Sequence, residues 1–244
     1  MKTYGVIGYP LEHSFSQRYF TKKFDHDGLD GYQYEAFPIK EISQLSQVIS
    51  SNPDLKGLNV TIPHKQTVIE FLDDRSKLPI GLNACNCIQF KEGKLIGHNT
   101  DIIGFEKSLR PLLKPHHKKA LILGHGGAAQ AVKFVLEKLK VEYVIVSRHS
   151  YADTQFTYAD LNEGNIDGHK LIINATPLGT YPDIHSFPSI PYQFLSEDHL
   201  LYDLVYNPEK TEFLKRGEER GATIKNGYEM LVLQAEAGWD IWNS

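Results

Sequence analysis

Apolar positions along the chain form short runs that alternate with longer stretches of helical spacing. Short runs rich in β-branched, aliphatic and aromatic residues predict strands, and apolar residues three or four positions apart predict helices. The expected strands are residues 4–7, 32–37, 58–61, 120–123, 143–146, 171–174 and 200–205. The expected helices are residues 15–24, 41–49, 65–72, 102–113, 128–139, 211–220 and 228–242. This alternation predicts an α/β fold with parallel sheets.

The pattern also indicates two α/β units rather than one. Residues 114–119 are polar, contain Pro115 and lie between an expected helix and an expected strand, so we expect a boundary region there. Residues 147–168 have little apolar periodicity, and their structure is left open. The final helix can pack on either unit.

The composition is that of a folded globular chain, with 41% hydrophobic and 23% charged residues. The formal net charge is −4 and basic residues are not concentrated anywhere, which argues against a nucleic-acid partner. No run of about 18 apolar residues is present, so neither a membrane span nor a usual export signal is expected. Cys85 and Cys87, the only cysteines, are badly placed to form a disulfide with each other. A cytoplasmic location fits these features best.

A glycine-rich turn between an expected strand and an expected helix carries the clearest chemical signal. Residues 124–129 read Gly-His-Gly-Gly-Ala-Ala, which satisfies the G-x-G-x-x-A pattern. Gly124 can make the tight turn, Gly126 lets the backbone approach a pyrophosphate, and Ala129 permits close packing of helix on strand. Ala128 begins the expected helix, whose N-terminus favours an anion. The turn therefore predicts a dinucleotide site, the alternative being a glycine-rich turn that binds nothing.

The end of the next expected strand bears on the choice of dinucleotide. An NAD-preferring site usually has Asp or Glu at this point, but the chain has Ser147, Arg148 and His149. The planar cation of Arg148 suits a 2′-phosphate, with Ser147 and His149 as further donors. These residues favour NADP over NAD, unless Arg148 is only an exposed surface cation.

Polar side chains gather at three expected strand ends in the first part of the chain, where an open parallel sheet normally binds ligands. Ser14 and Ser16 follow the first strand, and either could simply cap a helix. Asn59 and Thr61 share one side of a later strand. The other polar residues at these ends are Lys65 and Asp101.

Lys65 and Asp101 differ in how readily a structural role explains them. A cation at the start of an expected helix is poorly used structurally, so a functional role for Lys65 is favoured over an ordinary surface lysine. Asp101 could cap the helix that leads to the nucleotide unit, or it could face a basic residue across a groove between domains.

The chain contains 11 histidines, and His116 and His117 are adjacent. No Cys or His pair with metal-ligand spacing accompanies them, so no metal is expected and these two side chains should be solvated.

Taken in order, these motifs identify a family resemblance over nearly the whole chain: the sequence resembles shikimate dehydrogenase. The motifs are Gly8 to Ser16, Asn59-Val60-Thr61-x-Pro63-x-Lys65, Asn86, Asn99-Thr100-Asp101-x-x-Gly104-Phe105, the turn at 124–129, Asn174-Ala175-Thr176-Pro177-Leu178-Gly179, Asp203 to Pro208, and Gly227 to Ala235.

The resemblance implies an N-terminal α/β substrate domain and a Rossmann-type NADP-binding domain, with the last helix returning to the first domain. Residues 1–101 with 228–244 would form the substrate-binding and catalytic domain, and residues 102–227 the NADP domain. The implied activity is reversible, NADPH-dependent reduction of 3-dehydroshikimate to shikimate, a step towards chorismate and the aromatic amino acids. The implied assembly is a monomer or a homodimer.

The resemblance also implies a role for individual residues. Lys65 and Asp101 would form the catalytic pair, and Ser14, Ser16 and Tyr206 would hold the substrate carboxylate. The ring hydroxyls would be bound by Asn59, Thr61, Asn86, Asp101 and Gln234. The cofactor would be bound by Gly124, His125, Gly126, Gly127, Ala128, Ser147, Arg148 and His149, with Thr176, Leu204, Gly227 and Met230 near the nicotinamide.

Two alternatives stay open. A quinate/shikimate dehydrogenase would accept a saturated ring and could use NAD, although the two serines and Arg148 argue against it. A non-catalytic metabolite-binding regulator on the same scaffold is disfavoured because Lys65, Asp101 and the glycine turn occur together.

Overall fold

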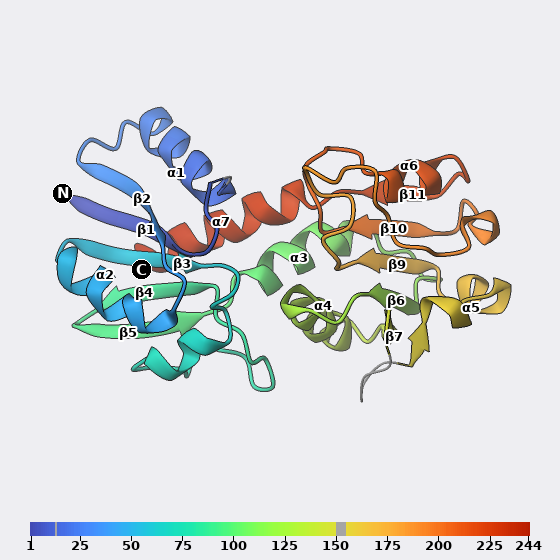
Figure 1. The fold of residues 1–244 in the computed structure, drawn as a ribbon, viewed down its shortest axis with the longest axis horizontal. Helices are drawn as coiled ribbons and strands as arrows, with labels where there is room; N and C mark the ends of the chain where they lie inside the picture. Colours follow the sequence, from blue (N-terminus) through green and yellow to red (C-terminus); the bar gives the residue numbers. More distant parts are fainter. Residues whose placement is uncertain (13, 150–154) are drawn as a thin grey trace. The chain divides into compact units, whose positions relative to one another are not determined.

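A computed structural model describes residues 1–12, 14–149 and 155–244 of the chain. The fold is α/β with two sheets, as predicted, and the chain forms two compact units (Figure 1). The first unit comprises Met1–Ile103 and Gln234–Ser244, and the second comprises Gly104–Leu233. Residues 114–119, the expected boundary region, therefore lie inside the second unit.

The first unit contains a mixed sheet in the order β2-β1-β3-β4-β5. Its strands are β1 (Lys2–Gly8), β2 (Tyr32–Pro38), β3 (Leu55–Val60), β4 (Cys87–Lys91) and β5 (Lys94–His98). The first three pair in parallel, whereas β4 and β5 pair antiparallel, so the expectation of purely parallel sheets is wrong for this unit. Glu92 and Gly93, both at positive φ, form the two-residue hairpin turn between β4 and β5.

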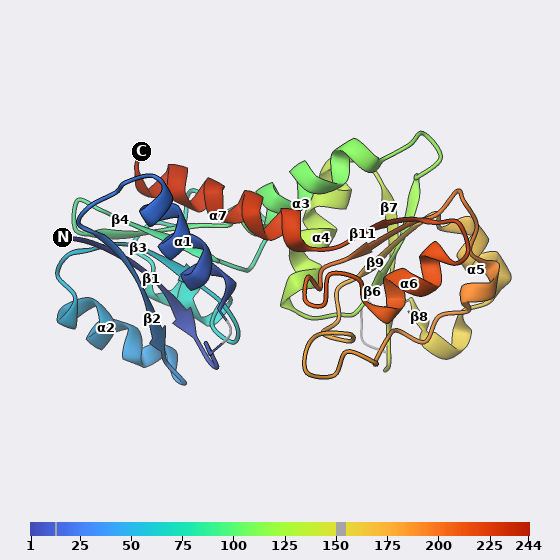
Figure 2. The same ribbon diagram turned by 90° about the horizontal axis from the view of Figure 1, so that it is seen from above.

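Helices cover both faces of this sheet (Figure 2). The helix α1 (Phe15–His26) and the later residues of α7 (Tyr228–Trp242) pack on the face that carries Tyr4 and Val6. The short 3-10 turn η1 (Ile42–Gln44) and the helix α2 (Leu45–Ser51) cover the face that carries Ile7. Alternate residues of β1 thus enter two different hydrophobic clusters, as the period of a strand requires.

The helix expected at residues 65–72 is not formed. The chain instead makes a turn followed by the 3-10 helix η2 (Thr67–Phe71). The turn is held by His64, which is buried with its Nε2 2.9 Å from the carbonyl oxygen of Ile39. Beyond η2, the amides of Asp73 and Asp74 donate to the carbonyl of Leu95 and draw the chain towards β5. Contacts on both sides leave no room for a longer helix.

The second unit contains a sheet in which the paired strands are parallel. Its order is β11-β10-β9-β6-β7-β8. The strands are β6 (Lys119–Leu123), β7 (Glu142–Ser147), β8 (Phe156–Thr157), β9 (Leu171–Asn174), β10 (Leu200–Asp203) and β11 (Thr223–Lys225). The chain proceeds outward from β6 to β8, returns to β9 and proceeds outward on the other side. The strand order therefore reverses between β6 and β9, which is where a doubly wound sheet binds its ligand.

Helices and 3-10 turns of the second unit lie on both faces of its sheet. The elements are α3 (Asp101–Leu109), η3 (Arg110–Leu112), α4 (Gly127–Lys138), η4 (Tyr158–Asp160), α5 (Glu163–Gly168), η5 (Tyr192–Phe194) and α6 (Glu212–Glu218). Phe213 of α6 and Ile166 of α5 join the cluster around Leu121 and Ile172. On the other face, Phe105 of α3 packs edge-on against Tyr202 with ring centroids 5.1 Å apart.

Each unit thus has a sheet and a hydrophobic core of its own, joined by two continuous helices. The boundary between the units falls within α3, after Ile103, and within α7, after Leu233. No helix in the described part of the chain is long and apolar enough to cross a membrane.

Candidate functional site

An ion pair lies among the polar side chains of the first unit. Lys65 lies in the turn after β3, and Asp101 is the first residue of α3. The Nζ atom of Lys65 donates to Oδ2 of Asp101 at 2.7 Å, and the two side chains are 25% and 14% exposed. Asp101 therefore meets its cation inside its own unit rather than across a groove between domains. The lysine remains accessible enough to reach a ligand.

Asn86 connects this ion pair to the rest of the cluster. Its amide nitrogen lies 2.9 Å from Oδ1 of Asp101 and 3.0 Å from Oγ1 of Thr100, and its amide oxygen accepts from the Thr100 backbone N–H at 2.6 Å. Oε1 of Gln234 lies 3.3 Å from Oγ1 of Thr100 and 3.4 Å from the Asn86 amide nitrogen. All but Asp101 and Lys65 are nearly fully buried. Packing and hydrogen bonds therefore fix the orientation of the carboxylate that holds Lys65.

Four other predicted substrate-binding residues also lie in the first unit, and two of them, Asn59 and Ser16, are joined through Tyr34. The hydroxyl of Tyr34 donates to Oδ1 of Asn59 at 2.6 Å and shares a hydrogen bond with the side chain of Ser16. Ser14 caps α1, because its Oγ accepts from the backbone N–H of Gln17 at 3.4 Å. Thr61 is half-buried directly after β3, and its backbone N–H donates to Ile7. The sequence did not indicate Tyr34, since a buried tyrosine in an apolar run resembles any core residue.

The two cysteines are buried next to the ion pair and are both free thiols, as expected. The backbone N–H of Cys85 donates to the carbonyl of Lys65 at 2.7 Å and so helps to place the lysine. Burial raises the pKa of Cys85 to about 11 and that of Cys87 well above its ordinary value. Neither thiol is therefore a nucleophile at neutral pH.

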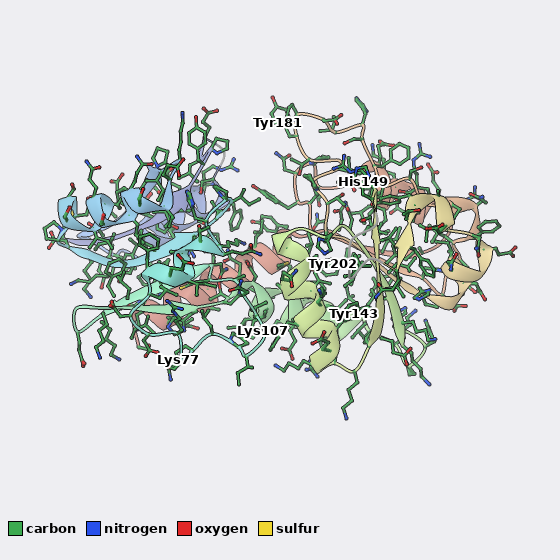
Figure 3. All side chains as sticks on the ribbon, turned by 60° about the horizontal axis from the view of Figure 1, so that its bottom comes forward. Lys77, Lys107, Tyr143, His149, Tyr181 and Tyr202 are labelled. Carbon is green, nitrogen blue, oxygen red and sulfur yellow. The ribbon has the colours of Figure 1, made fainter. Side chains whose placement is uncertain are left out.

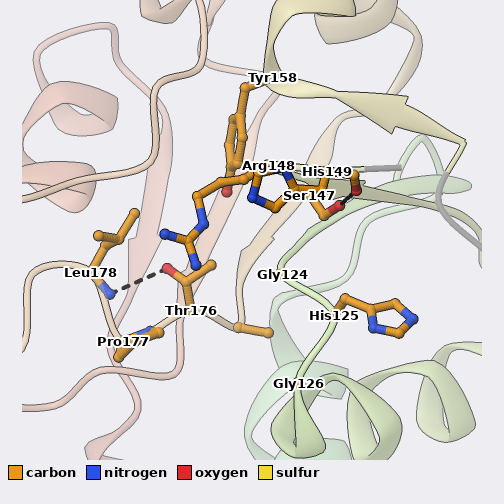
Figure 4. Close-up of a pocket in the computed structure, with 11 residues that line it drawn as sticks. Gly124, His125, Gly126, Ser147, Arg148, His149, Tyr158, Thr176, Pro177 and Leu178 are labelled. Atoms are coloured by element: carbon orange, nitrogen blue, oxygen red, sulfur yellow. Dashed lines mark hydrogen bonds between the residues drawn. The ribbon is translucent and has the colours of Figure 1, made fainter. Parts of the chain in front are cut away.

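A pocket of about 380 Å³ lies at the strand-order reversal of the second unit (Figure 4). It is formed by the segments that follow β6, β7 and β9, which is the carboxyl edge of the sheet. The lining residues are Gly124, His125, Gly126, Ser147, Arg148, His149, Tyr158, Ala175, Thr176, Pro177 and Leu178. Seven of the predicted cofactor-binding residues are among them: Gly124, His125, Gly126, Ser147, Arg148, His149 and Thr176.

The glycine turn has the close approach that its pattern predicts. Gly124 has a φ of +109°, and a Cβ there would lie 2.9 Å from the side chain of Thr176. A Cβ at Gly126 would meet nothing within 4 Å, so the backbone faces open space. Gly127 and Ala128 are the first residues of α4, and no side chain caps this helix. The turn therefore offers uncovered backbone N–H groups and the positive end of a helix dipole to an anion.

The chemistry of the lining fits a phosphorylated ligand. Arg148, His125 and His149 are the side chains able to carry positive charge, and none of the described lining residues is acidic. A site built for an unphosphorylated ribose would usually hold a carboxylate here. Tyr158 also lines the pocket, and its buried hydroxyl has no hydrogen-bond partner within residues 1–12, 14–149 and 155–244. Sequence analysis missed this residue because it lies in the stretch without apolar periodicity.

The remaining predicted cofactor residues lie near the ends of β9 and β10. The backbone N–H of Leu204 donates to Asn174, and that of Gly227 donates to Val205. A Cβ on Gly227 would lie 2.2 Å from the carbonyl oxygen of Leu204, so only glycine fits. Met230 is buried in the first turns of α7, and Tyr206 is half-buried after β10. Tyr206 belongs to the second unit, whereas Ser14 and Ser16 belong to the first.

A buried carboxylate ties these strand ends together. Oδ1 of Asp203 accepts from the Asn174 side chain at 2.9 Å and from the Val205 N–H at 3.0 Å, and Oδ2 accepts from Thr211 at 2.6 Å. Asn174 in turn accepts from the hydroxyl of Thr176 at 2.6 Å. The placement of Thr176 in the pocket therefore depends on Asp203.

The paired histidines differ from the expectation. His116 is exposed, but His117 is 5% exposed, and both ring Nε2 atoms lie 3.1 Å from the carbonyl oxygen of Asp198. Nδ1 of His117 also accepts from the backbone N–H of Lys114. The prediction that both are solvated is wrong for His117, because the loop folds onto the segment before β10. Within residues 1–12, 14–149 and 155–244, no three His, Cys, Asp or Glu side chains gather as around a metal ion.

Comparisons with known proteins identify similar sequences. Residues 6–88 match the model of the shikimate dehydrogenase substrate binding domain. The shikimate dehydrogenase (NADP(+)) of Methanosphaera stadtmanae is 36% identical over 98% of this chain and 90% of its own length.

Solved structures extend the likeness to the whole fold. A shikimate 5-dehydrogenase from Thermus thermophilus in complex with NADP(H) and shikimate is 28% identical, with a TM-score of 0.86 over 99% of this chain and 93% of its own. One from Listeria monocytogenes in complex with shikimate and NAD is 28% identical, with a TM-score of 0.88 over 100% and 92%. With its two α/β units, its Lys65–Asp101 pair and a relative 36% identical over almost its full length, the chain belongs to the shikimate dehydrogenase family.

Proposed function

We propose that the protein catalyses the reversible, NADPH-dependent reduction of 3-dehydroshikimate to shikimate, a step towards chorismate and the aromatic amino acids. The observation that carries the proposal is the Lys65–Asp101 ion pair at 2.7 Å, held in a buried amide and hydroxyl network. A site for recognising a ring with several hydroxyls needs such neutral donors and acceptors. Family membership supplies the reaction, and this geometry supplies the groups for it.

In the reductive direction, Lys65 is the proton donor. The bound cofactor supplies the hydride that the carbonyl carbon receives. An ammonium has three N–H bonds, so Lys65 can keep one on Asp101 and direct another to the ketone oxygen. It stabilises the negative charge that develops on this oxygen and then protonates it. Asp101 keeps the ammonium in place and is itself fixed by Asn86.

The substrate is held by hydroxyl and amide groups. Ser14, Ser16 and Tyr206 bind its carboxylate. The Oγ of Ser14 only accepts from the Gln17 N–H, so its own proton can be donated to the substrate. Asn59, Thr61, Asn86 and Gln234 bind the ring hydroxyls, together with Asp101. Such a site strongly rejects analogues without those hydroxyls, because its buried polar groups would then be unpaired.

The cofactor is NADP, bound by the second unit. Gly124 to Ala128 would hold its pyrophosphate, and Ser147, Arg148 and His149 its 2′-phosphate. Thr176, Leu204, Gly227 and Met230 would contact the nicotinamide, which supplies the hydride. The basic, carboxylate-free lining of the pocket supports this choice. The proposed substrate-binding and catalytic domain is residues 1–101 with 228–244, and the proposed NADP domain is residues 102–227. These bounds differ from those of the two compact units at residues 102–103 and 228–233. The free thiols Cys85 and Cys87 support a cytoplasmic location.

The decisive experiment follows absorbance of the reduced nicotinamide while shikimate or quinate is offered with NADP or NAD. Shikimate with NADP should give the highest kcat/KM of the four combinations. Faster oxidation of quinate with NAD would identify the quinate/shikimate type instead. Binding of shikimate without turnover with either nucleotide would identify a non-catalytic metabolite-binding protein.

A further inference from the structure

The hydroxyl of Tyr158 is a buried polar group that no contact in the fold explains. Its oxygen is buried and has no hydrogen-bond partner among the residues that the structure describes, and the residue lines the pocket of the second unit. Leaving a buried hydroxyl unpaired is unfavourable, because its lost hydrogen bonds to water are not replaced. Buried polar groups in native structures are rarely unpaired, and an unpaired one often has a functional role or binds a water or an ion.

The surroundings of this hydroxyl indicate what it would meet. Figure 4 shows the Tyr158 ring directed into the pocket, with its hydroxyl end towards the side chain of Arg148, and the arginine charge acts on the phenol. Arg148 has N–H donors and no acceptor, so two sets of donors face the same part of the pocket. None of the described lining residues is Asp or Glu, so no carboxylate of the pocket accepts hydrogen bonds from these donors. A group rich in acceptor oxygens fits this arrangement.

The protonation state of the phenol agrees with a donor role. Burial raises the pKa of Tyr158 to about 12, although the charge of Arg148 opposes this shift. The hydroxyl therefore keeps its proton at neutral pH and can donate it. A phosphate monoester carries a charge of about −1.5 to −2 at pH 7, with three acceptor oxygens, and it binds such donors by strong charge-assisted hydrogen bonds.

We propose that Tyr158 is a binding residue for the 2′-phosphate of NADP. When the neighbouring side chains move to admit the ligand, its hydroxyl donates to a phosphate oxygen beside the guanidinium of Arg148. This inference rests on the proposed function. It adds Tyr158 to the glycine turn and Arg148 as a residue that favours NADP over NAD. A ribose 2′-hydroxyl offers no anionic oxygen, so Tyr158 contributes much less to the binding of NAD.

The test compares Tyr158→Phe with the wild-type protein, using adenosine 2′,5′-bisphosphate and adenosine 5′-monophosphate as probes in calorimetric titrations. Loss of one charge-assisted hydrogen bond should weaken binding of the bisphosphate about tenfold or more and change binding of the monophosphate less than twofold. In the enzyme assay, the KM for NADP should rise while kcat stays within about twofold.

Tyr143→Phe is the matched control, because the Tyr143 hydroxyl donates to Glu137 at 2.6 Å and Tyr143 does not line the pocket (Figure 3). It should leave both affinities unchanged. A double variant with Arg148→Gln should lose less than the sum of the two single effects, because both residues hold one phosphate.

Equal affinity of Tyr158→Phe and wild type for the bisphosphate would overturn the inference, as would an equal loss for both probes. If the wild-type protein itself fails to prefer the bisphosphate, and Arg148→Gln changes nothing, the proposed NADP site is wrong rather than the role of Tyr158 alone.

Discussion

At the residue scale, the chemistry of the proposed reaction depends on a small number of side chains whose positions are set by their neighbours. Lys65 is held by Asp101, Asp101 by Asn86, and Asn86 by Thr100. Only Lys65 is placed to give up a proton, and the others orient it. Removing the lysine should therefore affect the chemical step more than substrate binding.

We expect Lys65→Ala to lower kcat by about 10²-fold or more, the contribution of a well-placed proton donor, with a smaller effect on the KM for shikimate. Steady-state rates with NADP and shikimate measure both. Lys77→Ala, which changes an exposed lysine of the same unit, is the control and should behave like wild type. Unchanged turnover in Lys65→Ala would remove this residue from the chemistry.

At the scale of elements, the ends of β9 and β10 and the start of α7 pack so closely that single atoms matter. Asp203 accepts hydrogen bonds from Asn174 and Val205 at these strand ends, and Gly227 lies against the backbone of Leu204. Asp203 should be sensitive to a change of charge and Gly227 to an increase in side-chain volume, so the two positions can be tested separately.

Asp203 should make the protein less stable as the pH rises from about 4 to 6. Burial raises the pKa of Asp203 to about 6 from an ordinary value of 3.8, although three hydrogen bonds oppose the shift. The folded chain therefore binds more protons than the unfolded chain in this range, and its free energy of unfolding falls by about 3 kcal/mol as the carboxyl ionises.

Urea unfolding of wild type and Asp203→Asn between pH 4 and 7 measures this effect. The other titrating groups are common to both proteins, so the difference between their unfolding free energies isolates Asp203. As the pH rises, the wild-type protein should lose stability relative to Asp203→Asn, because only the wild type has a carboxyl that ionises at this position. A difference that stays constant over this range would contradict a raised pKa.

Gly227→Ala should destabilise the protein by about 1–3 kcal/mol, the usual cost of overpacking, because its Cβ would lie 2.2 Å from a carbonyl oxygen. Gly168→Ala is the matched control, since a Cβ there meets nothing within 4 Å. Thermal unfolding of both variants is the measurement. Equal melting temperatures would show that the segment before α7 can move aside without cost.

At the scale of the whole molecule, each unit has its own sheet and core, and the two tryptophans report on only one of them. Trp239 and Trp242 both lie on α7 within the first unit and pack against Tyr4 and Phe20. Their fluorescence therefore follows the first unit, whereas far-ultraviolet circular dichroism follows both.

Adenosine 2′,5′-bisphosphate should stabilise the second unit selectively. At about 100 times its Kd, it adds about 2.7 kcal/mol to the unfolding free energy of the unit that binds it. We expect the urea transition seen by circular dichroism to shift upward and the tryptophan transition to shift less. Equal shifts of both signals would mean that the units unfold together, through the helices that they share.

Much of the fold could be predicted, because in a long segment the spacing of the apolar residues distinguishes a helix from a strand. The strands β1, β2, β6, β7 and β9 and the helices α1, α4 and α7 lie close to their predicted positions. The short elements β8, β11 and α5 were missed, since a few residues contain too little periodicity. The β4–β5 hairpin was missed although Glu92-Gly93 between two apolar runs indicates such a turn.

The sequence by itself determined the α/β class, the glycine turn with its following helix, and the identity of the polar residues at the strand ends, because these depend on neighbouring positions in the chain. The tertiary structure decided which of these residues meet. Lys65 and Asp101 are 36 residues apart, and their 2.7 Å contact depends on the sheet that brings β3 and β5 into one unit. It also decided that Tyr34 orients Asn59 and that the hydroxyl of Tyr158 is buried at a pocket, with no hydrogen-bond partner in the described part of the chain. Burial and long-range hydrogen bonds are properties of the folded chain, so no local pattern could reveal them.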